Sequence, residues 1–114
     1  MRVLLAISTH TFVLMILEKT EFQLLIINKI KNLREQHKVS QAQISDIIGL
    51  NSVGQVGNIE SPKFKHKYTL EQIYVLAVHF NYPVANLFLT EEELGKPASE
   101  IIDKLLLKII AYNK

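Results

Sequence analysis

Histidine and glutamate residues are the first candidates for catalysis or metal binding in this chain of 114 residues. The four histidines show no pairing at the spacing of metal ligands, and there is no cysteine to complete a zinc site or to act as a nucleophile. Three adjacent acids, Glu91 to Glu93, suit the first turn of a helix, where carboxylates favour the helix dipole. We therefore expect no catalytic site, no metal site and no cofactor, and we do not expect an enzyme.

A second group of polar side chains, in the middle of the chain, suits contact with the edges of nucleobases. Asn51, Ser52, Gln55 and Asn58 follow one another closely, and the amides of Asn and Gln can pair with adenine in the major groove of DNA. The same stretch has no Arg or Lys, the usual partners of guanine. For Ser52 and Asn58 the alternative is that they only cap a helix and bind water.

A cationic run follows these amides, although the net charge of +2 does not by itself indicate a nucleic-acid protein. Its candidates for contact with DNA phosphates are Lys63, Lys65, His66 and Lys67. Three phosphates neutralised per subunit, or six per dimer, would give a slope of log affinity against log salt of about −5. The alternative is a solvated loop whose lysines only confer solubility. We expect the aromatic residues between the cations to anchor the loop on the core.

Short sequence signals for helix starts and ends predict that helices position both the amide residues and the cationic run. Three capping boxes mark helix starts, at Ser40 with Gln43, Thr69 with Gln72 and Thr90 with Glu93. Gly49 and Gly95 mark helix ends. The apolar period and these signals predict helices over residues 22–38, 41–48, 52–60 and 70–81, a short one after Pro83, a brief turn at residues 90–95, and a last helix over residues 98–112.

The length suits one domain with additions at both ends. We expect an N-terminal extension at residues 1–21, whose apolar stretch at residues 3–17 is shorter than the roughly 20 residues of a membrane span. A signal peptide is disfavoured because no small-residue cleavage site follows Leu17. The stretch either precedes a native start at Met15 or packs on the domain or on a partner. We expect no membrane association, and the lack of cysteine is consistent with a cytoplasmic protein.

The order and spacing of these features resemble the helix-turn-helix domain of the phage-repressor and Cro-like family, of the XRE type, over residues 25–88. The residues that carry the resemblance are Ile30 to Gln36 in the first helix, Val39-Ser40-Gln41 at the entry to the second, Gly49 in the turn, Val56 to Glu60 at the end of the third, Leu76 to Phe80, and Asn86 to Phe88. The resemblance implies an all-α, five-helix bundle over residues 22–89 and DNA binding through its third helix. It also implies that Gln41 meets a phosphate or braces a residue that contacts a base.

Two departures from the family pattern affect the site. Ser45 stands where the family usually has Ala. In the family, an apolar residue of the third helix faces the core at a fixed distance from the turn glycine. Counted from Gly49, that position holds Gln55, and the apolar residue Val56 comes one residue later. The register of the third helix is therefore open by one residue.

The C-terminal extension, residues 90–114, contains an apolar helix that has no evident mate in a bundle already closed at Phe88. We predict homodimerisation through Ile102, Leu105, Leu106 and Ile109, the alternative being that this face covers Leu24, Ile27 and the N-terminal stretch. The expected function is a repressor-like transcriptional regulator that binds operator DNA as a homodimer. The alternatives are an antitoxin with a toxin as protein partner, a controller of a restriction system, or a degenerate bundle that acts as a protein-interaction module.

Overall fold

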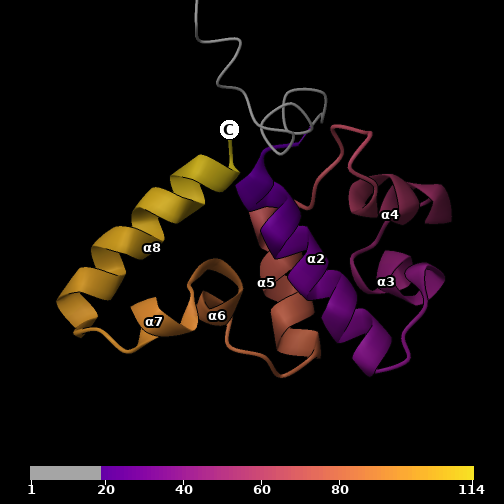
Figure 1. Ribbon diagram of the computed structural model, residues 1–114. Helices are drawn as coiled ribbons and strands as arrows, with labels where there is room; N and C mark the ends of the chain where they lie inside the picture. Colours follow the sequence, from indigo (N-terminus) through magenta and orange to yellow (C-terminus); the bar gives the residue numbers. More distant parts are fainter. Residues whose placement is uncertain (1–18) are drawn as a thin grey trace, which may run out of the picture.

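A computed structural model of the protein describes residues 19–114, and Figure 1 shows the arrangement of their helices. The described residues form seven helices and no strand: α2 (Glu21–Gln36), α3 (Gln41–Ile47), α4 (Val53–Glu60), α5 (Leu70–His79), α6 (Ala85–Phe88), α7 (Glu91–Leu94) and α8 (Ala98–Tyr112). The all-α class is thereby confirmed for this part of the chain. Met15 and the rest of residues 1–18 lie outside it.

Four of the helices begin with a reciprocal capping box, in which the N-cap hydroxyl accepts from the N3 backbone N–H and the N3 side chain accepts from the N-cap backbone N–H. The predicted boxes that open α3, α5 and α7 are all present. The fourth box, formed by Thr20 and Gln23, opens α2. This box was not predicted from the sequence. Because it caps the helix at Thr20, α2 begins at Glu21, one residue earlier than predicted.

Three helices end in the same left-handed turn. After α3, Gly49 has a φ of 73°, the N–H of Gly49 donates to Asp46 O and the N–H of Leu50 donates to Ser45 O, which is the Schellman pattern. The same pair of bonds closes α2 with Lys38 (φ 56°) and α5 with Asn81 (φ 52°) in the left-handed position. These turns fix the directions in which α3, α4 and α6 leave their predecessors.

One hydrophobic core joins the bundle to its C-terminal helix. Every described helix except α7 contributes buried residues to this core, together with Tyr68 and Phe80 on either side of α5. The buried residues are Ile26, Ile27, Ile30, Ile44, Val56, Ile59, Tyr68, Ile73, Leu76, Ala77, Phe80, Leu87, Phe88 and Tyr112. Tyr112 is fully buried, and its hydroxyl donates to Tyr68 O at 2.8 Å while its own carbonyl accepts from Gln23 Nε2 at 2.9 Å. The end of α8 is thereby attached to the start of α2.

The same C-terminal half of α8 is also held by α7. Lys108 of α8 forms an ion pair with Glu93 and lies 5.7 Å from the ring centre of Phe22. The hydrogen bond from Lys108, together with one from the backbone N–H of Thr90, lowers the pKa of Glu93 to about 2. The predicted helix-start role of the acidic triplet is thus seen at Glu93, which also anchors α8.

The face of α8 that was predicted to dimerise is divided between two environments. Leu105 and Ile109 are partly buried and pack against the core of their own chain, whereas Ile102 and Leu106 are 57% and 55% exposed. The first pair therefore docks α8 on the core of its own bundle, and the N-terminal stretch named in the alternative prediction lies outside the described residues.

Helix α2 lies at the centre of the molecule, with α3 and α4 on one side of it and α8 on the other (Figure 1). The two faces that the sequence singled out, the amide-bearing helix and the apolar C-terminal helix, are thus well separated. Within residues 19–114, no helix is both long enough and apolar enough to cross a membrane.

Candidate nucleic-acid interface

Helices α3 and α4 form a closely packed pair that bears most of the predicted site residues. Ile44 in α3, and Val56 and Ile59 in α4, are buried at 4% exposure or less. Gln55 is exposed. The apolar side of α4 therefore faces inward at Val56, which resolves the register that the sequence left open.

The connection between the two helices is fixed by a small polar residue. The Ser45 side chain is buried, and its Oγ lies 3.3 Å from Leu50 O and 3.4 Å from Ser52 O, so the hydroxyl can donate to the carbonyls of the turn. An Ala at this position would leave those carbonyls without that donor. Together with the left-handed turn at Gly49, Ser45 sets the angle at which α4 leaves α3.

The outward side of α4 is uncharged and mixes polar side chains with the apolar Val53, which is 50% exposed. Asn51, Ser52 and Gln55 are exposed, while Asn58 is half-buried. Ser52 is the N-cap residue of α4, but its side chain makes no capping hydrogen bond. The alternative role of Ser52 as a side-chain cap is therefore not observed, and its hydroxyl stays on the surface.

The last residue of α4 is the centre of a buried polar network. The Glu60 carboxylate accepts from Arg34 Nε at 2.8 Å and Nη2 at 3.0 Å, and from Gln41 Nε2 at 2.9 Å. Arg34 also donates to Val39 O at 3.1 Å. The side chains of Arg34 and Glu60 are only 12% and 6% exposed. The hydrogen bond to Glu60 raises the pKa of Arg34, which keeps the guanidinium charged.

This network gives Gln41 a definite orientation. One N–H of its amide is directed at Glu60, so the side chain connects the start of α3 to the end of α4. Gln41 Oε1 lies close to α4, since a Cβ added at Gly57 would come within 3.6 Å of it. Gln41 thus braces Glu60, whose side chain is buried and which is not one of the residues predicted to contact a base, so the role that the family resemblance implied for Gln41 stays a prediction.

A buried lysine holds the same end of α4 from another direction. Lys19 is 3% exposed, and its Nζ donates to the carbonyls of Asn58 at 3.2 Å, of Phe64 at 2.6 Å, and of Ser61. Burial lowers the pKa of Lys19, whereas three carbonyl acceptors favour the ammonium form. The last carbonyls of a helix have no partner within the helix, so Lys19 acts as a C-terminal cap from outside it.

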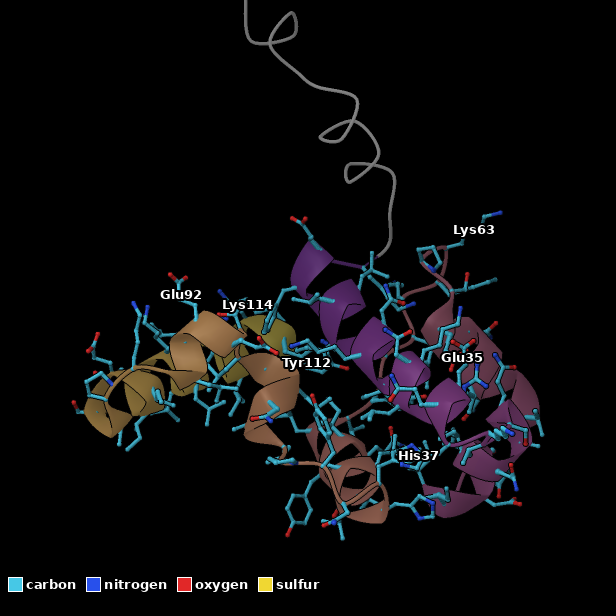
Figure 2. All side chains as sticks on the ribbon, turned by 60° about the horizontal axis from the view of Figure 1, so that its bottom comes forward. Glu35, His37, Lys63, Glu92, Tyr112 and Lys114 are labelled. Atoms are coloured by element: carbon cyan, nitrogen blue, oxygen red, sulfur yellow. The ribbon has the colours of Figure 1, made fainter. Side chains whose placement is uncertain are left out.

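The cationic run beyond α4 divides into exposed and engaged residues. Lys63, Lys65 and His66 are exposed, and Figure 2 shows Lys63 extending away from the body of the molecule. Lys67 is instead half-buried, and its Nζ donates to Tyr112 O at 2.7 Å and lies 5.2 Å from the ring centre of Tyr112. Burial lowers the pKa of Lys67. Lys67 thus links the loop to α8 and is not available as a free surface cation.

The two aromatic residues of this run also differ. Tyr68 is fully buried and anchors the loop, as expected, and burial raises the pKa of its hydroxyl. Phe64 does not anchor the loop: it is 46% exposed, and its ring lies 6.1 Å from that of His66. The exposed part of the loop therefore presents one aromatic ring among its cations.

The structure brings the predicted amide and cationic residues to neighbouring positions along α4 and the loop that follows it. Sequence reasoning missed the contributions of Lys19, Arg34 and Glu60, which support this surface from beneath. Apart from the hydrogen bond between Arg34 and Val39, their side-chain hydrogen bonds join residues 19 to 45 positions apart, and no local pattern indicates such pairs. Compared with known protein families, with curated proteins and with solved structures, the chain matches none of them.

Proposed function

We propose that the protein is a sequence-specific DNA-binding regulator in which α3 and α4 act as a helix-turn-helix and α4 enters the major groove. The observation that carries the proposal is the group of exposed, uncharged polar side chains at the start of α4, Asn51 and Ser52 just before the helix and Gln55 in its first turn, together with the exposed cations of the loop that follows α4. The major groove of DNA admits an α-helix, and amide side chains on such a helix can form hydrogen bonds with adenine. Cations beside the helix can contact the phosphates of the DNA backbone. In this proposal the protein is not an enzyme.

Gly54 supports a close approach of α4 to a ligand. Glycine in a helix costs up to about 1 kcal/mol relative to alanine. A Cβ at Gly54 would meet only Ser52 Oγ, at 3.6 Å, which is ordinary contact, so the fold itself does not require glycine there. Gly54 is exposed beside Gln55, where an absent side chain lets the helix backbone approach a base or phosphate.

The loop supplies a smaller phosphate contact than the sequence suggested. Because Lys67 is bound to Tyr112, Lys63 and Lys65 remain as the lysines free to meet the DNA backbone. Two phosphates neutralised per subunit, or four in a dimer, give a salt slope of about −4.

The first experiment is selection of binding sites from random duplex DNA with the full chain, followed by affinity measurements on the enriched sequence. We expect Gln55→Ala to lose affinity and to relax preference at one or two positions of the site. Lys63→Gln and Lys65→Gln should weaken binding to all sequences alike, and each should reduce the magnitude of the salt slope by about 1 per subunit. Lys96→Gln removes the same charge at the exposed turn before α8 and is the matched control.

Gly54→Ala separates function from folding. We expect this variant to be more stable than the wild type and yet to bind DNA less tightly, because the new methyl group occupies the approach surface. Failure to enrich any sequence at low and at moderate salt, with folded protein, would contradict the proposal. That result would favour the alternative of a protein-interaction module, for which the lack of Arg and Lys on α4 is the supporting observation.

A further inference from the structure

Helix α8 has more apolar surface than the described residues, 19–114, cover. Its inward side carries Leu105, Ile109 and the fully buried Tyr112. On the outward side, four large apolar side chains are 55–66% exposed: Ile102, Leu106, Leu107 and Ile110. We call these four residues the outer stripe. A helix that is apolar on two sides is typical of one that packs against two neighbours, and the bundle provides only one.

We propose that the outer stripe binds the same stripe of a second copy, with the two α8 helices antiparallel. The stripe is self-complementary about Leu106. When two such helices run in opposite directions, Ile102 of one faces Ile110 of the other, and the two Leu106 side chains meet at the two-fold axis. This arrangement deepens the proposed function, since a two-fold symmetric protein suits a pseudo-palindromic site, but it can be tested without DNA.

The charges along α8 favour a second copy in this orientation. Glu100 and Asp103 are exposed in the first half of the helix, and Lys114 is exposed just beyond its end. An antiparallel pair brings the acidic half of each helix to the basic end of the other and opposes the two helix dipoles. A parallel pair would place like charges side by side.

The size of the stripe predicts a weak dimer. Each of its side chains leaves roughly 100 Å² of apolar surface in water, so two copies would bury about 800 Å² from the stripe alone. With flanking residues such as Ser99 and Ala111, the total approaches the lower end of the range for specific interfaces, about 1,200 Å². We therefore expect association at micromolar protein concentrations. Because α8 lies across α2 from α3 and α4, the second copy would leave α4 uncovered (Figure 1).

The lack of cysteine makes the geometry directly testable, because any disulfide must come from an introduced residue. Leu106→Cys should form a disulfide-linked dimer under mild oxidation. Ile102→Cys and Ile110→Cys should not crosslink when each is oxidised alone, but a mixture of the two should give the mixed dimer. Efficient crosslinking of Ile102→Cys or Ile110→Cys with itself would overturn the antiparallel arrangement.

Sedimentation equilibrium of the full chain tests the dimer itself. We expect Leu106→Glu to raise the dimer dissociation constant by about 100-fold, because the change acts twice at the centre of the interface. Val78→Glu, at an apolar position on α5 that is 60% exposed, is the matched control and should dimerise like the wild type. Thermal unfolding of each variant shows whether it is folded. A wild-type protein that is still monomeric at roughly 0.1 mM, 100 times the expected micromolar dissociation constant, would overturn the proposal. Residues 3–17 or a different protein would then be the candidate to cover the outer stripe. A dimer without DNA affinity would uphold this inference and overturn the proposed function.

Discussion

The hydrogen-bonded pair of Arg34 and Glu60 offers the most direct test of how α4 is held. We consider the change Arg34→Met, which keeps the length and apolar stem of the side chain but removes the guanidinium. Glu60 would keep only the hydrogen bond from Gln41, at 2.9 Å, while its side chain is 6% exposed. A carboxylate that is buried and has lost its cation is strongly unfavourable.

The expected cost is large relative to the stability of the fold. Breaking a buried ion pair by removal of one partner costs about 3–5 kcal/mol, and a domain of this size is stable by only about 5–15 kcal/mol. The double variant Arg34→Met with Glu60→Met removes both charges, so no buried charge is left without its partner. We expect it to be more stable than the sum of the two single effects predicts, by about 2–3 kcal/mol.

Urea unfolding, followed by far-ultraviolet circular dichroism, gives the required free energies of unfolding. Glu35→Gln is the control, because Glu35 lies 3.8 Å from Arg34 but its side chain is 54% exposed, and we expect this change to cost less than about 0.5 kcal/mol. If the effects of the two Met substitutions add within about 0.5 kcal/mol, Arg34 and Glu60 do not act as a unit and the reasoning fails.

Three further predictions concern stability. Tyr112→Phe should lower the free energy of unfolding by about 1–2 kcal/mol, because the Tyr112 hydroxyl donates to Tyr68 O. Tyr68→Phe should be neutral or slightly stabilising, because the buried Tyr68 hydroxyl has no hydrogen-bond partner among the described residues. Equal effects of the two changes in urea unfolding would contradict the assigned contacts. Glycine adopts a positive φ at lower cost than other residues. Lys38→Gly, at a φ of 56°, should therefore stabilise the fold by about 0.5–1 kcal/mol, and Gly49→Ala, at a φ of 73°, should destabilise it by about 1 kcal/mol. Thermal midpoints of the two variants that shift in the same direction would refute this. The pKa of Glu93 is lowered to about 2 from an ordinary 4.5, so its ion pair with α8 contributes stability above pH 4.5 that is lost as the pH falls toward 2; Glu93→Gln should flatten the acid limb of the stability curve, and an unchanged limb would exclude this contribution.

The helices could be predicted closely because their signals are local. The apolar period and the capping residues of a helix lie within a few positions of one another, and the predicted starts of α3, α5 and α8 agree with the structure. The missed box at Thr20 and Gln23 has the same spacing as the other three, so the sequence contained that information as well. The left-handed turn at Lys38 had no glycine to indicate it.

The environment of individual side chains on these helices could not be predicted in the same way. Ile102, Leu105 and Ile109 are alike as apolar residues of one helix, and their exposure differs because α8 docks on α2 and α6 along one side. Lys67 stands in a cationic run, yet its contact with Tyr112 depends on a helix that ends 45 residues later. Such contacts are set by the tertiary arrangement, which a local pattern does not contain.

The supports of α4 are concentrated at one end of the helix, and this has a functional consequence. Glu60 binds Arg34 and Gln41, and Lys19 binds the carbonyls of Asn58 and of the loop. At the other end, the side chain of the N-cap residue Ser52 makes no capping bond, and the Ser45 hydroxyl contacts Ser52 only at its carbonyl, at 3.4 Å. The C-terminal end of α4 is therefore fixed to the body of the molecule, and its first turn is left with exposed groups. In the proposed DNA complex, that first turn is the part that adjusts to the base edges, while the fixed end and the adjoining cationic loop set the position of the protein on the phosphate backbone. Changes beneath the fixed end should therefore weaken binding to all sequences alike, and changes in the first turn should alter which sequence is preferred.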